Sequence, residues 1–164
     1  MMIFATVGTQ LPFDRLLVAM DAWAAANPGV EIHAQTGESA ATLANLHTNK
    51  FLNNDVFMDL FAKADIVVAH AGMGTILAAC EMGKTVVIMP RLAAQGEHRN
   101  DHQIATCERM SVLSNVIVAD DETQVAAALD RAIAGEGKAV GDGVNPYASS
   151  ELLEAVSAFV KGEW

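Results

Sequence analysis

The chain has 164 residues, 52% of them apolar, and a formal net charge of −10. This length and apolar content suffice for one well-buried core, so we expect a single domain over residues 1–164. The acidic charge argues against binding to nucleic acid, and it indicates that any contact with an anionic membrane surface needs a partner chain.

No segment has the features of a leader or a membrane anchor. The first apolar run, residues 3–7, follows no basic region and is cut short by Gly8. No other run approaches the ~18 apolar residues that a membrane span needs. The two cysteines, Cys80 and Cys107, have neither metal-binding nor disulfide spacing. We therefore expect a cytoplasmic protein with reduced, buried thiols.

Apolar, β-branched runs alternate with amphipathic segments along the chain. The runs predict strands at residues 3–7, 30–35, 66–69, 85–89 and 116–118. The amphipathic segments predict helices at residues 12–26, 55–63, 75–82, 101–110 and 122–134. Asp55 is the expected cap of the second of these helices, and Gly83 is expected to end the third. Residues 38–54 give a mixed signal of helix and loop.

This alternation predicts an α/β fold of the Rossmann-like kind, with three α/β/α layers built on a parallel sheet. Ligands of such sheets bind beyond the carboxyl ends of the strands. Polar or glycine-rich stretches follow three of the expected strands, at residues 8–10, 70–75 and 91–103. These three strand ends are therefore the candidate site.

The C-terminal part carries two further signals. Residues 135–146 contain four glycines and no periodic pattern, which predicts a mobile surface loop. Ser149 or Ser150 is expected to cap a final helix, with an apolar face between residues 152 and 160. That face either packs on the core of this chain or docks on another subunit.

The second strand end has the composition of a phosphate-binding turn. Gly72 and Gly74 at a helix N-terminus let backbone N–H groups approach a phosphate, whose charge the helix dipole favours. His70 and Thr75 are expected to donate to the same group, unless Thr75 caps the helix instead. The alternative interpretation is a tight strand-to-helix turn with a structural histidine.

The third strand end is followed by a dense run of hydrogen-bonding side chains. Glu97, His98, Asp101, His102 and Gln103 all lie within seven positions. Carboxylates and amides bind pairs of hydroxyls with directional hydrogen bonds, so the run predicts a sugar-binding loop. A solvated helix start with charge pairs four residues apart is the alternative.

Other ligand signatures fail. His98 and His102 have the spacing of a helical metal pair, but no third ligand is identifiable, so we expect no metal. The P-loop pattern is absent, and Gly8 begins no dinucleotide-binding pattern with an acid at the end of the next strand. The nucleophile elbow of α/β hydrolases is also missing. NAD and ATP are therefore disfavoured, and no cofactor is expected.

Several motifs stand in a recognisable order along most of the chain. They are FATVGT at residues 4–9, PFDRL at 12–16, ADIVVAHAGMGT at 64–75, GK at 83–84, MPR at 89–91 and GEHRNDHQ at 96–103. Together they resemble the family 28 glycosyltransferases, in particular small single-lobe subunits related to the C-terminal, UDP-sugar-binding half. Similar subunits act in dolichol-linked N-acetylglucosamine transfer and in bacterial exopolysaccharide synthesis.

The resemblance implies one lobe of a GT-B fold that is split over two chains. This lobe would hold a UDP-sugar, and a membrane-associated partner subunit would hold a lipid-linked acceptor and the catalytic base of an inverting displacement. The resemblance places Gly8 and Thr9 beside the diphosphate, His102 and Gln103 at the donor sugar, and Arg91, Glu97, His98 and Asp101 along the same loop. The phosphate turn itself would be His70, Ala71, Gly72, Met73, Gly74 and Thr75.

One position departs from the family pattern. Several members carry a glutamate that binds the ribose hydroxyls three residues after the position of Thr75, where this chain has Ala78. Glu81 is one helical turn further on, and we expect it to face solvent. Two alternatives stay open: a non-catalytic nucleotide-sugar-binding regulator, and a UDP-sugar epimerase or hydrolase, although related GT-B enzymes of that kind hold both lobes in one chain. A homo-oligomer is compatible with each.

Overall fold

The described part of the chain is a parallel sheet with helices on both faces. The computed structural model describes residues 1–138 together with residues 154, 157, 158 and 161. The strands are β1 (Met2–Thr6), β2 (Glu31–Gln35), β3 (His47–Asn49), β4 (Ile66–His70), β5 (Thr85–Met89) and β6 (Val116–Val118). The helices are α1 (Asp14–Ala26), α2 (Asn54–Lys63), α3 (Met73–Glu81), α4 (His102–Met110) and α5 (Val125–Ile133), with 3₁₀ turns at Ala93–Gln95 and Glu122–Gln124.

The order of the strands creates a switch point in the sheet. The strands pair as β3-β2-β1-β4-β5-β6, and every pairing is parallel. The chain builds outward from β1 to β3, and then returns to β4 on the other side of β1. In open sheets of this type, ligands bind where the order reverses, outside the carboxyl ends of the strands. Here that place lies between β1 and β4.

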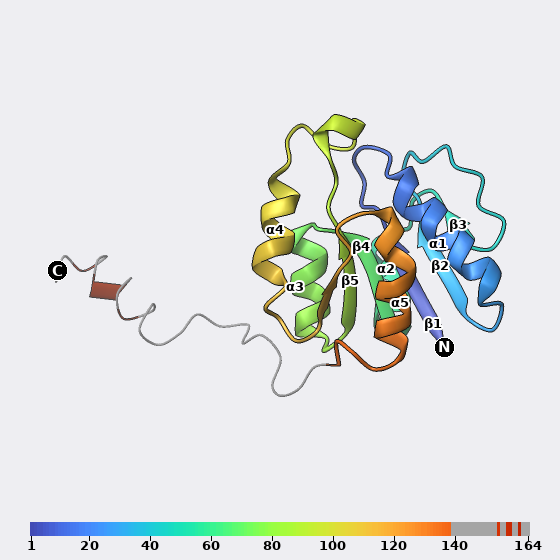
Figure 1. The fold of residues 1–164 in the computed structure, drawn as a ribbon. Coiled ribbons are helices and arrows are strands. Elements are labelled where there is room, and N and C mark those ends of the chain that lie inside the picture. The colour runs from blue at the N-terminus through green and yellow to red at the C-terminus, as the bar shows by residue number, and fades with distance from the viewer. Residues whose placement is uncertain (139–153, 155–156, 159–160, 162–164) are drawn as a thin grey trace.

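Two apolar clusters fix the layers. Successive strand side chains point to opposite faces, so Ile3 and Val68 pack with α1 and α5, while Phe4 and Val67 pack with α2, α3 and α4. Figure 1 shows α3 and α4 on one side of the sheet and α1 and α5 on the other. Because strands β4 and β5 are covered on both faces, they read as continuous apolar runs, and the predicted three-layer α/β fold is confirmed.

Some boundaries differ from the prediction. The cap of α2 is Asn53, whose Oδ1 accepts a hydrogen bond from the Val56 amide at 2.9 Å, so the prediction of Asp55 was wrong. The stretch 38–54 contains β3, which the sequence did not reveal because its three residues are all exposed and polar. The helix predicted at residues 122–134 begins as a 3₁₀ turn and becomes α-helical at Val125.

Other expectations are confirmed or lie outside the described residues. Gly83 ends α3 with a φ of 61°, a left-handed conformation that glycine adopts without strain. Cys80 and Cys107 are buried and unbridged, and burial raises the pKa of the Cys107 thiol to about 12. No helix among the described residues is long and apolar enough to cross a bilayer. The loop expected at 135–146 and the final helix fall mostly on residues that are not described.

The Asn53 cap gives a test of the fold. The Asn53→Ala variant loses the acceptor for the Val56 amide, so its free energy of unfolding should fall by about 1 kcal/mol. Denaturant unfolding followed by circular dichroism measures this change. Asn54→Ala, one position later on the same exposed helix start, is the matched control and should change stability by less than ~0.5 kcal/mol. Equal losses in the two variants would contradict the assignment of the cap.

Candidate functional site

A pocket opens at the switch point of the sheet. It encloses about 320 Å³ and is lined from three strand ends. The loop after β1 contributes Val7, Gly8, Thr9 and Gln10, the end of β4 contributes His70 and Gly72, and the segment after β5 contributes Arg91, His98, His102 and Gln103. The fold therefore brings together residues from the three stretches that the sequence singled out. Four residues of the predicted phosphate turn are not among the lining residues, namely Ala71, Met73, Gly74 and Thr75.

Four larger hollows border other parts of the described residues, and two of these stand out by volume. One of about 650 Å³ is bordered by Ile66 and Thr85, at the amino ends of β4 and β5, and one of about 490 Å³ lies beside α4 around Cys107. Neither contains the glycine-rich turns. We take the switch-point pocket as the candidate site, because ligands of parallel sheets bind at the carboxyl ends of the strands.

The N-terminus of α3 presents free backbone donors beside this pocket. Its cap position is Gly72, which has no side chain to bond the first amides, and the first intrahelical bond runs from the Ile76 amide to the Gly72 carbonyl. Among the described residues, no group accepts a hydrogen bond from the amides of Met73, Gly74 or Thr75. Thr75 lies within α3 and is therefore not its cap. A helix start of this kind attracts an anion through its N–H groups and its dipole.

The His70 ring lies between two glycines. A Cβ atom at Gly8 would come within 2.9 Å of the ring carbon Cε1, and a Cβ at Gly72 would overlap Nε2. Both positions must therefore be glycine while the ring keeps this place. Gly8 also has a φ of 75°, in the left-handed region. Nε2 faces Gly72 and the start of α3, and the buried Nδ1 has no hydrogen-bond partner among the described residues.

His70 is neutral at physiological pH. Burial, together with the charges of Arg91 and His98, lowers the pKa of His70 to about 4. A neutral imidazole has one N–H donor and one acceptor nitrogen. His70 can therefore offer a hydrogen bond to a ligand, but it brings no positive charge to the pocket.

Arg91 ties the walls of the pocket together. Its side chain is only 2% exposed, and its Nη1 donates to the carbonyls of Pro12 at 2.9 Å and Glu97 at 3.0 Å. Nη2 donates to the Val7 carbonyl at 2.6 Å, and the guanidinium stacks on the Phe13 ring at 4.7 Å. Both terminal nitrogens of Arg91, which the sequence placed among the donor-binding residues, are thus engaged by the protein.

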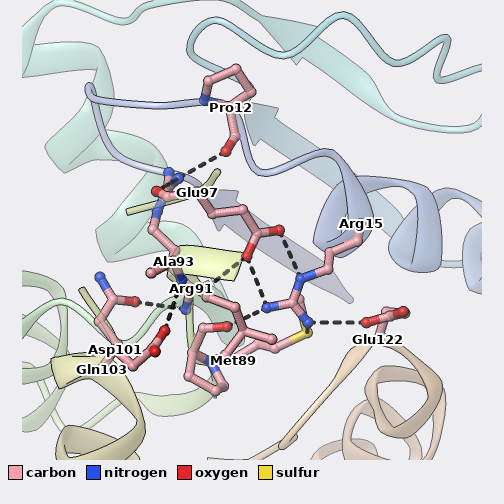
Figure 2. A network of polar contacts seen from close by, with 11 residues as sticks. Pro12, Arg15, Met89, Arg91, Ala93, Glu97, Asp101, Gln103 and Glu122 are labelled. Atoms are coloured by element: carbon pink, nitrogen blue, oxygen red, sulfur yellow. Dashed lines mark hydrogen bonds and ion pairs between the residues drawn. The ribbon is translucent and has the colours of Figure 1, made fainter. Parts of the chain in front are cut away.

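The Glu97 carboxylate points away from the pocket. Its Oε1 accepts from Arg15 Nε at 2.7 Å, and its Oε2 accepts from Arg15 Nη2 at 3.0 Å and from the Leu92 amide at 2.9 Å. Figure 2 shows the resulting network between the loop after β1, the segment after β5 and Glu122. Glu97 is 7% exposed. It therefore shapes the loop and has no oxygen lining the pocket, unlike the sugar contact expected from the sequence.

The remaining polar residues divide between the loop and the pocket. Asp101 lies outside the pocket, where its Oδ1 accepts from the Ala93 amide at 2.7 Å. Gln103 is buried, and its Oε1 accepts from the Arg91 amide at 3.0 Å. His98 and His102 line the pocket with their rings edge to face, the centroids 4.5 Å apart. Burial, followed by the charges of His102 and nearby arginines, lowers the pKa of His98.

The charge of the pocket differs from that of the chain. No aspartate or glutamate is among the lining residues, whereas the whole chain has a net charge of −10. The lining instead contains three histidines and the Arg91 cation. Within residues 1–138 and the few later described positions, no group of three or more His, Cys, Asp and Glu could hold a metal ion. The arrangement suits an anionic, hydrogen-bonding ligand.

Sequence reasoning did not find the role of Phe13 and Arg15. Both occur in the PFDRL motif, but a pattern within one segment does not show that its arginine meets a carboxylate 82 positions away. The only available signal was a basic residue in the first turn of α1, where the helix dipole disfavours positive charge.

Comparison with known proteins identifies the family of this sequence. Residues 2–135 match the family described as the glycosyltransferase family 28 C-terminal domain. No curated protein sequence is similar enough to count as a match.

Solved structures show the same fold at low sequence identity. The glycotransferase of kitacinnamycin has a TM-score of 0.63 and 21% identity, over 79% of this chain and 34% of its own. UDP-GlcNAc 2-epimerase from Neisseria meningitidis, bound to UDP-GlcNAc, has a TM-score of 0.63 and 11% identity, over 98% of this chain and 44% of its own. The solution structure of ALG13 has a TM-score of 0.58 and 17% identity, over 94% of this chain and 93% of its own. The chain thus spans less than half of the glycotransferase and of the epimerase.

The low pKa of His70 predicts a pH dependence of stability. Between pH 6.5 and about 4 the unfolded chain binds a proton at this position and the folded chain does not, so stability should fall as the pH falls through this window. With about 1.4 kcal/mol for each pKa unit, the contribution reaches at most about 3 kcal/mol at pH 4. Comparing unfolding free energies of the wild type and His70→Gln between pH 4 and 7.5 isolates this contribution. Parallel profiles, or a ring titration by NMR near 6.5, would contradict the prediction.

Proposed function

We propose that this chain, which belongs to the glycosyltransferase family 28 C-terminal domains, binds the UDP-sugar donor of a glycosyltransferase in the switch-point pocket. The observation that carries the proposal is the N-terminus of α3. Within the described part of the chain its first three amides have no partner, and the adjoining pocket has no acidic lining residue. A diphosphate needs such donors and is repelled by carboxylates.

The pocket residues suggest how the bound donor is oriented. We assign the diphosphate to the amides of Met73, Gly74 and Thr75, with His70 Nε2 donating from one side and Gly8 and Thr9 bordering it. Amides and a neutral imidazole stabilise the negative charge that develops on departing UDP without having to reorganise. The sugar then lies toward His98, His102 and Gln103. A second hollow of about 440 Å³, lined in part by Gln10 and His98, continues the pocket in that direction.

The chain is expected to be one component of a two-component inverting enzyme. The switch-point pocket is near the lower limit of volume for a ligand site, so another chain must cover the rest of the donor and hold the acceptor. The near-complete mutual coverage with ALG13 supports a subunit that consists of this lobe. We propose a membrane-associated partner with a lipid-linked acceptor of polysaccharide synthesis and the catalytic base, with this chain recruited from the cytoplasm.

Two other functions fit part of the data. The similarity to UDP-GlcNAc 2-epimerase over 98% of the chain favours an epimerase or hydrolase as the second candidate. A nucleotide-sugar-binding regulator is the third. It is favoured by Ala78, which cannot bind ribose hydroxyls, because the exposed Glu81 lies three residues further along α3, about 4.5 Å farther from the N-terminus of the helix.

Gly74→Asp tests the diphosphate site. A Cβ atom at this position would meet no atom within 4 Å, and an acid in the first helical turn favours folding, so the variant should fold at least as well as the wild type. Its carboxylate lies beside the free amides and repels a diphosphate there. Calorimetry should therefore show UDP binding weakened by at least about tenfold. Gly74→Asn, of the same size without the charge, is the control and should lose far less. Gly72 is unsuitable for this test, because any side chain there displaces His70.

Undiminished binding of UDP by Gly74→Asp would contradict the assignment of the diphosphate to α3. Failure of the wild-type chain to bind UDP, UDP-N-acetylglucosamine or UDP-glucuronate at millimolar concentration would contradict the proposed function itself.

Activity assays test dependence on a partner. The isolated chain, mixed with a UDP-sugar and membranes that contain lipid-linked acceptors, should release no UDP above background. Co-expression with a chain that carries the acceptor-binding lobe should restore transfer. Product analysis by chromatography separates the three functions, since an epimerase would convert UDP-N-acetylglucosamine without the second chain, and a regulator would leave it unchanged in both mixtures.

A further inference from the structure

We propose that Arg15 and Glu97 are positioning residues for the sugar end of the donor site, an inference that rests on the proposed function. Neither residue lines the pocket, and neither bonds to the phosphate turn at residues 70–75. What they hold is the segment between β5 and α4, which supplies His98 to the pocket.

The pair has the geometry of a specific clamp. The Arg15 fork meets both oxygens of Glu97, and the side chains of the two residues are only 13% and 8% exposed. Arg15 also donates to Glu122 Oε2 at 3.0 Å and to the Pro90 carbonyl. A planar guanidinium that bonds a carboxylate at two points fixes both distance and orientation, which a lysine cannot do.

The clamp fixes the loop at several successive points. Arg15 holds the Pro90 carbonyl at the start of the segment, and the Glu97 carboxylate holds the Leu92 amide. The main-chain carbonyl of Glu97 is held by Arg91. Because His98 is the next residue, its backbone has little freedom, and its ring is directed into the pocket beside His102.

Stability alone does not explain a buried pair at this place. Removing two charges from water is costly, and apolar residues of similar volume often stabilise a core as well or better. An apolar pair would also leave the Leu92 amide and the Pro90 carbonyl without these partners. The pair is therefore best explained by the loop shape that it enforces, and its loss should affect the sugar more than the nucleotide.

The test compares UDP with a UDP-sugar in matched variants. Calorimetry gives the dissociation constants of UDP and of whichever of UDP-N-acetylglucosamine and UDP-glucuronate the wild type binds more tightly. Glu97→Gln keeps the size but loses the charge, and it should weaken UDP-sugar binding roughly tenfold while UDP binding changes by less than about twofold. Arg15→Met should have the same effect, and the loss in the double variant should be smaller than the sum of the two single losses, because the two residues share one ion pair.

Glu136→Gln is the matched control. It removes the same charge from an ion pair with Arg131 whose side chains are 51% and 49% exposed, and it should change neither dissociation constant. Equal weakening of UDP and UDP-sugar in Glu97→Gln, or no weakening of either, would overturn the inference. Melting temperatures recorded for all variants show whether a uniform loss reflects unfolding.

A second measurement works without any ligand. In Glu97→Gln the NMR signals of the His98 and His102 rings should shift, while those of the stacked His33 and His47 rings at the sheet edge should stay in place. Unchanged His98 signals would overturn the positioning role even if the wild type binds no nucleotide. The failure of this inference and the failure of the proposed function are therefore distinguishable.

Discussion

The structure at the carboxyl edge of the sheet depends on the buried guanidinium of Arg91, which connects the loop after β1 to the segment after β5. The carbonyls of Val7 and Pro12, from the loop after β1, and the carbonyl of Glu97, from the segment after β5, all accept hydrogen bonds from this one side chain. One planar cation with several N–H groups satisfies all three and stacks on Phe13. Burial lowers the pKa of Arg91, but the nearby Glu97 carboxylate counteracts this effect, so the cation is kept where the loops meet.

The network also explains how an acidic protein keeps an acid-free pocket. Glu97 and Asp101 lie in the loop that borders the pocket, yet the Glu97 carboxylate is turned to Arg15 and that of Asp101 to the Ala93 amide. With these charges directed away from the pocket and the Arg91 Nη atoms bonded to carbonyls, the neutral His70 ring and the free amides of α3 remain as donors. Such groups attract an anion without the flexible cations that would bind any anion from solution.

Much of the fold could be predicted from the sequence, because strands buried on both faces give continuous apolar runs, as in β4 and β5. The exception, β3, is exposed and polar, and it depends on pairing with β2 for its existence. The sequence also indicated which strand ends meet at the candidate site, since parallel topology brings carboxyl ends together. It could not indicate whether a charged side chain points into the pocket or toward a partner elsewhere in the protein. Glu97 resembled a sugar ligand until its partner, Arg15 from a distant helix, was seen.

The unpartnered amides at the start of α3 require a pocket that is open to water. Amides without partners are costly when buried away from water, so a lobe that exposes them must leave them to solvent until a ligand arrives. Solvent, however, weakens every electrostatic interaction with that ligand. A chain that closes over the pocket would expel this water and strengthen the same hydrogen bonds without any change in the amides. The proposed donor site of this lobe is therefore expected to bind its ligand weakly alone and more tightly when another chain covers the pocket.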